Sequence, residues 1–99
     1  PKPQTLTVHV DNLVLTGACG GLGQALARRF VAGGARVALV GLNRPVLEAL
    51  AQGAPGRCRV YTPDVSDPAA MQAMAQDWVT RVGLPDAVIA NAGVAGGYD

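Results

Sequence analysis

Short apolar runs alternate with segments of helical periodicity along most of the chain. The apolar runs occupy residues 13–16, 37–40, about 57–62 and 86–90. Between them, apolar side chains recur every three or four residues: Leu22, Leu26 and Phe30, then Val46, Leu47 and Leu50, then Met71, Met74, Trp78 and Val82. Such spacing marks one face of a helix, whereas a short unbroken apolar run is typical of a buried strand. The pattern therefore predicts four strands joined by three helices.

Residues with strong positional preferences mark where these elements begin and end. Asn43 and Asp67 precede helical segments, and their side chains can accept hydrogen bonds from the free amides of a first turn. Pro68 suits that first turn, because the amide hydrogen it lacks would have no partner there. Gly33–Gly34 and Gly83 follow helical segments and are expected to end them.

The order of the elements predicts the fold. Strands without polar alternation that are separated by helices indicate a parallel sheet covered on both faces. Right-handed connections then place the strands in the spatial order 3-2-1-4, the first part of a doubly wound, Rossmann-type α/β fold. We assign residues 12–99 to this partial domain and residues 1–11 to an N-terminal tail or an added edge strand. The stripe that contains Met74 and Trp78 is expected to pack on the sheet rather than hold a cofactor.

Composition narrows the classes of function. The chain has 99 residues, 49% of them hydrophobic, so it is one folded domain or a part of one. Its 8 basic residues are scattered and are nearly balanced by 7 acidic ones, so no basic stripe is available to nucleic acid. No apolar run approaches the roughly 20 residues that cross a bilayer, and no targeting leader opens the chain. We therefore expect a cytoplasmic protein that binds neither nucleic acid nor membrane.

Metal and disulfide chemistry have little support in the sequence. His9 has no cysteine or second histidine beside it, so no metal site is predicted. Cys19 and Cys58 adjoin the first and third strands, and the second strand between them would hold them about 10 Å apart. Bridged cysteines have Cα atoms within about 7 Å, so we expect two free, small, buried side chains.

A glycine-rich loop, Gly17 to Gly23, connects the first strand to the first helix. Glycine lets the backbone approach a pyrophosphate, and the free amides and positive dipole end of the helix attract its negative charge. Alone, the loop is a weak signal, because glycine-rich turns also serve other ligands and close packing.

Three motifs together make the signal specific. Thr16, Gly17, Gly21 and Gly23 match the pattern Thr-Gly-x-x-x-Gly-x-Gly, and on this loop the chain resembles the short-chain dehydrogenase/reductase family. Asp64–Val65 resembles the family's Asp-Val pair, which meets the adenine, and Asn91-Ala92-Gly93 matches its Asn-Ala-Gly motif, which lines the cofactor cleft. Each motif follows a predicted strand, which is where open α/β sheets bind ligands.

The resemblance implies an NAD(P)-dependent oxidoreductase that transfers hydride between a carbonyl and an alcohol. The residues it assigns to the dinucleotide follow the ends of the four strands. They are Gly17, Cys19, Gly20, Gly21, Leu22, Gly23, Leu42, Asn43, Asp64, Val65, Asn91, Ala92 and Gly93.

The choice between NAD and NADP stays open in the sequence. An acidic residue after the second strand would favour NAD, and Leu42 stands where NADP-using relatives often carry arginine. Residues 41–44 contain no acid, and Arg44 gives only a slight preference for NADP.

The branch of the family is a second choice. Gly17, Gly20 and Gly23 also fit the loop of the longer, epimerase-like relatives, although Asn91-Ala92-Gly93 favours the shorter oxidoreductases. A methyltransferase of similar fold would not account for that asparagine motif.

The family's catalytic residues are missing from these 99 residues. Relatives use a tyrosine as general acid or base, a lysine four residues later and a serine that positions the substrate oxygen. The only lysine is Lys2, so no Tyr-x-x-x-Lys occurs, and Ser66 stands where it serves local capping.

Two explanations compete for this absence: the chain is the nucleotide-binding portion of a longer enzyme, or it is a non-catalytic nucleotide-binding module. We favour the first, because a chain that stops after the fourth strand leaves a sheet edge and part of a face uncovered. For the parent enzyme we expect a small carbonyl or alcohol substrate and a homo-oligomer, and for this segment alone no activity.

Overall fold

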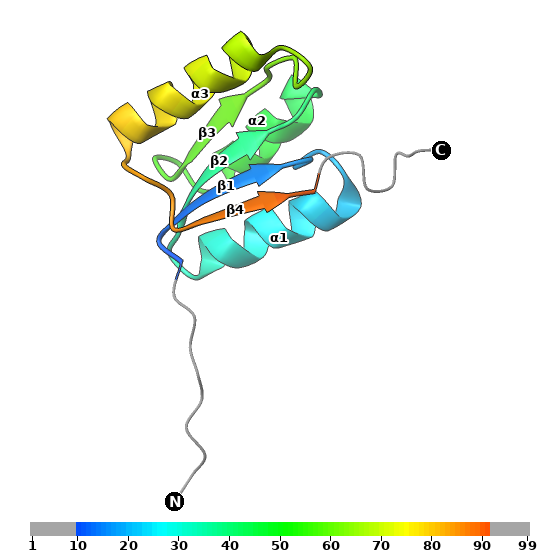
Figure 1. Ribbon diagram of the computed structural model, residues 1–99. Helices are drawn as coiled ribbons and strands as arrows, with labels where there is room; N and C mark the ends of the chain where they lie inside the picture. Colours follow the sequence, from blue (N-terminus) through cyan, green and yellow to red (C-terminus); the bar gives the residue numbers. More distant parts are fainter. Residues whose placement is uncertain (1–9, 92–99) are drawn as a thin grey trace, which may run out of the picture.

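The computed structural model describes residues 10–91, which fold into three layers, with a four-stranded sheet between helices (Figure 1). The elements in chain order are β1 (Asn12–Thr16), α1 (Gly21–Ala32), β2 (Arg36–Val40), α2 (Arg44–Gln52), β3 (Cys58–Tyr61), α3 (Pro68–Arg81) and β4 (Ala87–Ala90). The four strands and three helices expected from the sequence are all present.

All strand pairs in the sheet are parallel, and the order is β3-β2-β1-β4. In the centre of the sheet, Leu13 of β1 lies beside Val37 of β2 on one side and beside Ala87 of β4 on the other. The predicted order 3-2-1-4 and the doubly wound fold class are confirmed. Because all the strands are parallel, their carboxyl ends lie at one edge of the sheet.

One face of the sheet packs against α1 and α2. Alternate residues of β1 and β2, including Leu13, Leu15 and Leu39, are fully buried there against Ala27 of α1 and Leu47 of α2. Cys19 and Cys58 lie at the margin of this core, and both are free thiols. Burial of these aliphatic side chains supplies the main stabilisation of the layer, at about 25 cal/mol per Å² of apolar surface removed from water.

The opposite face packs against α3 through Trp78. The Trp78 ring is almost fully buried and stands edge-on to Tyr61 of β3, with 6.3 Å between ring centroids. Its indole N–H donates to the side-chain oxygen of Asn12 at 2.7 Å, and the Asn12 amide donates in turn to the Gly83 carbonyl at 3.0 Å. Asn12 therefore anchors the end of α3 to the start of β1, and the predicted packing role of Trp78 is confirmed.

One strand boundary and one expected core position differ from the prediction. The strand β4 begins at Ala87 because Asp86 turns its carboxylate towards β1, where it accepts the amides of Asp11 and Asn12 at 2.9 and 3.0 Å. The first helix begins at Gly21, and its buried positions are Gly23 and Ala27, whereas Leu22 is 61% exposed. Leu22 therefore projects from the strand-end edge and does not join the core stripe.

The sequence expectations for the two ends of the chain fall mostly outside the described residues. The residues outside are 1–9 of the tail or edge strand proposed for residues 1–11, with His9, and Ala92 and Gly93 of the third motif. Within residues 10–91, no three His, Cys, Asp or Glu side chains lie close enough to hold a metal ion. No helix in this part of the chain has the length and apolar character needed to cross a membrane. The expected cytoplasmic location stays a prediction.

Candidate functional site

The candidate site is built from the segments that follow the four strands. The glycine loop leaves β1 at Gly17, and the β2–α2 turn leaves β2 at Gly41. The Asp64 turn lies beyond β3, and Asn91 follows β4 directly. Parallel strands carry these segments to the same edge of the sheet, where the start of α1 also lies (Figure 1).

The backbone of the glycine loop requires glycine at two positions. Gly17 has a φ of 67°, in the left-handed region that other residues rarely adopt. At Gly23, an added Cβ would fall 2.8 Å from the Ala18 Cα and still closer to the Gly17 carbonyl oxygen. The first turn of α1 is thus pressed against the end of β1 with no room for a side chain between them.

Glycine at the start of α1 has a different reason. A Cβ at Gly21 would meet no atom within 4 Å, and one at Gly20 would meet only the Gly17 carbonyl oxygen, at 3.9 Å. Neither position needs glycine for internal packing, so the small residues leave the outer surface of the loop open. This is the arrangement that a backbone cradle for an anion requires.

The helix α1 also lacks the caps that the other two helices have. Asn43 caps α2 by accepting the Val46 amide at 3.3 Å, and Asp67 caps α3 by accepting the Ala69 amide at 3.0 Å. At α1 the cap position is Gly20, with no side chain, and the first turn contains no acid. The first amides of α1 and the positive end of its dipole therefore face the strand-end edge without an internal anion.

Asn91 ties the end of β4 to the glycine loop. Its side-chain amide donates to the Gly17 carbonyl at 3.3 Å, and its backbone amide donates to the Thr16 hydroxyl at 3.0 Å. The structure thus brings together the first residues of two of the three motifs, which lie more than 70 positions apart in the chain. Asn91 therefore holds the glycine loop in place, in addition to any contact with a ligand.

The β2–α2 turn contacts the loop through Cys19. The Asn43 amide donates to the Cys19 sulfur at 3.3 Å, and the thiol donates to the Asn43 carbonyl at 3.7 Å. Leu42, between Gly41 and Asn43, is 77% exposed at the strand-end edge. The next residue, Arg44, donates to Glu48 at 3.1 Å and to the Thr62 hydroxyl at 3.2 Å, so its guanidinium extends from α2 towards the end of β3.

The third segment of the site is the turn at Asp64. One oxygen of the Asp64 carboxylate accepts both the Ser66 hydroxyl, at 2.6 Å, and the Ser66 amide, at 2.9 Å. These two bonds lower the pKa of the Asp64 carboxyl below its ordinary value, so the group is ionised at neutral pH. Val65 beside it is 56% exposed. The hydrogen bonds of Asp64 stay within its own turn, and Ser66 acts locally, as predicted.

Sequence reasoning missed two residues that shape the site. Gln24 donates its side-chain amide to the Cys19 carbonyl at 2.7 Å, which fixes the loop from the helix side. Gly41 faces the Cys19 sulfur, a contact that its position after a strand does not predict. Its place directly before Leu42 and Asn43 could have assigned Gly41 to the site. Nothing in the sequence could have assigned Gln24, because glutamine on a helix is usually solvated.

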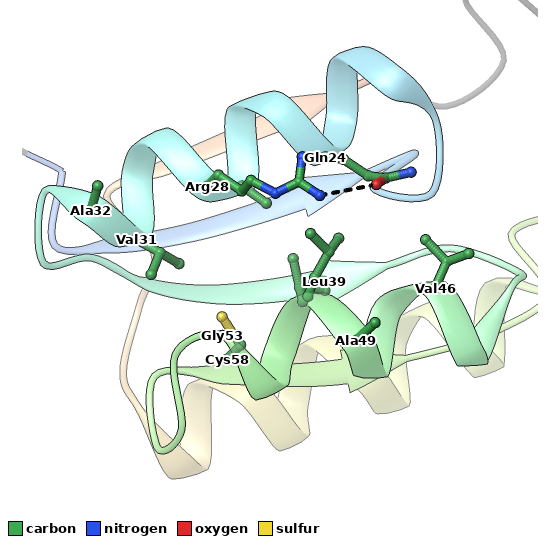
Figure 2. Close-up of a pocket in the computed structure, with 11 residues that line it drawn as sticks. Gln24, Arg28, Val31, Ala32, Leu39, Val46, Ala49, Gly53 and Cys58 are labelled. Carbon is green, nitrogen blue, oxygen red and sulfur yellow. Dashed lines mark hydrogen bonds between the residues drawn. The ribbon is translucent and has the colours of Figure 1, made fainter.

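A groove of about 570 Å³ lies away from this site, between α1 and α2 (Figure 2). Val31, Leu39 and Val46 line it with other small apolar side chains. At its rim, Arg28 donates to the Gln24 side chain, one turn earlier on α1, at 3.4 Å. The groove is on a helical face of the sheet, not at the strand ends. Its size reflects the small alanines at the helix contact and does not mark the candidate site.

The fold and this strand-end edge define the chain as a Rossmann-type domain of the doubly wound class. Within that class it belongs to the short chain dehydrogenase family, whose model matches residues 11–99. The family resemblance on which the sequence interpretation rested is thereby confirmed.

Curated relatives support the assignment. The 1-deoxy-11-beta-hydroxypentalenate dehydrogenase of Streptomyces arenae is 40% identical over 88 residues, which are 84% of this chain and 30% of that protein. The meso-2,3-butanediol dehydrogenase of Serratia marcescens is 39% identical over 90 residues, 88% of this chain and 36% of that protein. The chain spans about a third of the length of these relatives.

Solved structures give the same result. A short-chain dehydrogenase from Streptomyces avermitilis superimposes with a TM-score of 0.79 at 31% identity, over 84% of this chain and 31% of that one. A blue fluorescent protein from a metagenomic library, in complex with NADPH, has a TM-score of 0.77 at 29% identity, over 85% and 36%. The 3-ketoacyl-(acyl-carrier-protein) reductase of Brucella melitensis, complexed with NADH, has a TM-score of 0.73 at 27% identity, over 79% and 32%.

Proposed function

We propose that this chain supplies the dinucleotide-binding part of an NAD(P)-dependent oxidoreductase that interconverts a carbonyl and an alcohol. The observation that carries the proposal is the glycine cradle at the uncapped start of α1. Gly17 and Gly23 hold the loop in place, while Gly20 and Gly21 leave its outer surface open. An anion such as a pyrophosphate would meet free amides and the positive end of the helix dipole there.

The remaining site residues are assigned along the same edge. Cys19 and Leu22 flank the cradle, and Leu42 and Asn43 would face the adenosine ribose from the β2–α2 turn. Asp64 and Val65 would meet the adenine, and Asn91, with Ala92 and Gly93, would line the cleft. Exposed apolar side chains at Leu42 and Val65 support an adenine site, because a purine ring is largely apolar on its two faces. When bound, the nicotinamide supplies hydride transfer, and these residues bind and orient the dinucleotide.

Within this proposal we favour NADP over NAD. The turn at residues 41–44 has no carboxylate, so nothing in it would repel a 2′-phosphate. Arg44 is the cation of this turn, and its bonds to Glu48 and Thr62 hold it at the strand-end side of α2. Its side chain is about half exposed, so it is free to exchange these partners for a phosphate.

The family match over residues 11–99 favours the short-chain oxidoreductases over the epimerase-like branch. The rival that keeps a specific observation in its favour is a non-catalytic nucleotide-binding module, since these residues contain no Tyr-x-x-x-Lys. A carbonyl or alcohol substrate, a homo-oligomeric state and a cytoplasmic location stay predictions.

The experiment that tests the cradle is a titration of the full chain with NAD and NADP, comparing the natural sequence with Gly21→Leu. A Cβ at Gly21 meets no atom within 4 Å, so the melting temperature should change little, whereas dinucleotide affinity should fall at least about 30-fold because the side chain obstructs the anion site. The matched control is Gly33→Ala at the other end of α1, where an added Cβ makes only ordinary contacts. Unchanged affinity in Gly21→Leu would remove the cradle assignment.

A further inference from the structure

The thiol of Cys19 joins the two loops that would hold opposite parts of the cofactor's adenosine diphosphate. Its sulfur accepts the Asn43 amide at 3.3 Å and its hydrogen is directed to the Asn43 carbonyl at 3.7 Å. On its other side, the Cys19 carbonyl accepts the Gln24 side-chain amide at 2.7 Å. Cys19 is therefore held from both α1 and the β2–α2 turn.

Gly41 completes this contact by leaving room for the sulfur. A Cβ placed on Gly41 would lie 2.5 Å from the Cys19 Sγ, well inside van der Waals contact. The same Cβ would be 3.5 Å from a methyl carbon of Leu47, which is an ordinary contact. The sulfur is thus the one atom that requires glycine at position 41, and any side chain there would rotate the thiol away from Asn43.

The turn that Cys19 fixes carries the residues that would choose between NAD and NADP. Asn43 caps α2 with its side chain while its backbone is paired with the thiol, so a shift of the sulfur moves the start of α2. Leu42 and Arg44 stand on either side of Asn43. A change at Cys19 therefore reaches the ribose end of the site without altering any residue that would touch the 2′-position.

We propose that Cys19 and Gly41 form a matched pair that positions the β2–α2 turn and thereby sets the preference for NADP over NAD. Cys19 is a positioning residue, which acts through Asn43. This inference rests on the proposed function, because it concerns the same dinucleotide site.

The test is a double-substitution cycle in the full chain, with affinities for NAD and NADP measured by titration. Cys19→Ala removes both thiol hydrogen bonds, and Gly41→Ala displaces the thiol, so each should lower the ratio of NADP to NAD affinity by about fivefold, the usual value of one neutral hydrogen bond. Because both changes break the same contact, the double variant should match either single one. Cys19→Ser keeps a donor and an acceptor and should retain the natural ratio within about twofold.

Controls separate positioning from general damage. Cys58→Ala removes the other thiol, which is on the first residue of β3 and lines the α1–α2 groove, and should leave the affinity ratio unchanged. A melting temperature recorded for each variant reports on folding, and Cys19→Ser against Cys19→Ala decides the matter if Gly41→Ala does not fold.

Two results would overturn the inference. The first is an unchanged ratio in Cys19→Ala, and the second is a double variant whose loss is the product of the two single losses. If the natural chain binds neither dinucleotide, the proposed function fails and this inference fails with it. Binding by the natural chain with an unchanged ratio in Cys19→Ala refutes the positioning role alone.

Discussion

At the scale of single residues, the same residue type serves two different purposes in the loop. Gly17 and Gly23 are required by the fold, one by its positive φ and the other by the carbonyl against which it packs. Gly20 and Gly21 have open space around them, so their smallness has no internal explanation. The sequence motif treats Gly17, Gly21 and Gly23 alike, and only the structure separates the packing positions from the open ones.

Asp64 offers a prediction at this scale, because its carboxylate is only partly engaged. Both hydrogen bonds from Ser66 use one oxygen, Oδ1, so Oδ2 is available to an adenine amino group. We expect Asp64→Ala to weaken dinucleotide binding by about tenfold, the usual effect of losing one hydrogen bond to a charged group. Isothermal titration of the full chain measures this loss.

Ser66→Ala is the matched control for Asp64. It removes the hydroxyl that donates to the carboxylate but leaves the carboxylate itself, so affinity should stay within about twofold. Equal losses in the two variants would mean that Asp64 serves only its own turn and does not meet the ligand.

At the scale of elements, β3 and α3 are joined by a charged cluster on the face opposite the α1–α2 groove. Asp77 of α3 accepts the Tyr61 hydroxyl at 2.5 Å, the Arg59 guanidinium at 3.0 Å and the Arg81 guanidinium at 2.9 Å. Burial, followed by the bond to Asp77, raises the pKa of Tyr61 to about 12, and the Tyr61 bond and Arg81 lower the pKa of Asp77. The cluster fixes α3 across the edge strand β3.

The shifted pKa of Tyr61 predicts a loss of stability at high pH. Because the folded pKa lies above the ordinary value of 10.0, the stabilisation is complete below about pH 10 and disappears as the pH rises towards 12. Tyr61→Phe lacks the hydroxyl that donates to Asp77, so it should melt at a lower temperature than the natural chain at neutral pH. The difference between the two melting temperatures should shrink between about pH 10 and 12.

Thermal unfolding of both proteins across that pH range provides the measurement. Other groups that ionise at high pH are common to the two proteins and cancel in the difference. A difference in melting temperature that stays constant from about pH 9 to 12 would show that the Tyr61–Asp77 bond contributes nothing that depends on ionisation.

Elements were more predictable from the sequence than the contacts between them. Asn43 and Asp67 were expected as caps and are caps, because a capping side chain bonds to amides only two or three residues away. Gln24 bonds to the Cys19 carbonyl and Gly41 faces the Cys19 sulfur, and neither contact follows from helical periodicity or capping preference. The polar Asn12 lay outside the apolar run predicted for residues 13–16, yet it is the first residue of β1 and the buried partner of Trp78.

At the scale of the whole molecule, the connection rules determined the strand order, and the order determined where the site lies. Right-handed crossovers leave β1 and β4 adjacent in the sheet although they are far apart in the chain, so Asn91 meets Gly17. The connection rules do not predict which side chains pack against β4. Val88 is 61% exposed on the face that carries α3, so within the described residues this end of the sheet lacks the apolar cover that Trp78 of α3 gives to Tyr61 of β3.

Catalysis is the property of the whole molecule for which these 99 residues carry no Tyr-x-x-x-Lys motif. The family resemblance places the general acid or base on a tyrosine with a lysine four residues later, and the single lysine here is Lys2. Free tyrosine titrates near pH 10, so a tyrosine without a nearby cation would not exchange a proton efficiently at neutral pH. We therefore expect a polypeptide of residues 1–99 to bind NADP yet transfer no hydride to any carbonyl compound.

The measurement pairs an NADPH oxidation assay over a panel of ketones and aldehydes with the intact mass of the purified natural protein. A natural protein well above 10.1 kDa that oxidises NADPH, beside an inactive 99-residue polypeptide, supports the oxidoreductase proposal. Turnover by the 99 residues alone would show that the reaction needs no tyrosine–lysine pair, and a natural mass of 10.1 kDa without turnover would leave a nucleotide-binding module as the function.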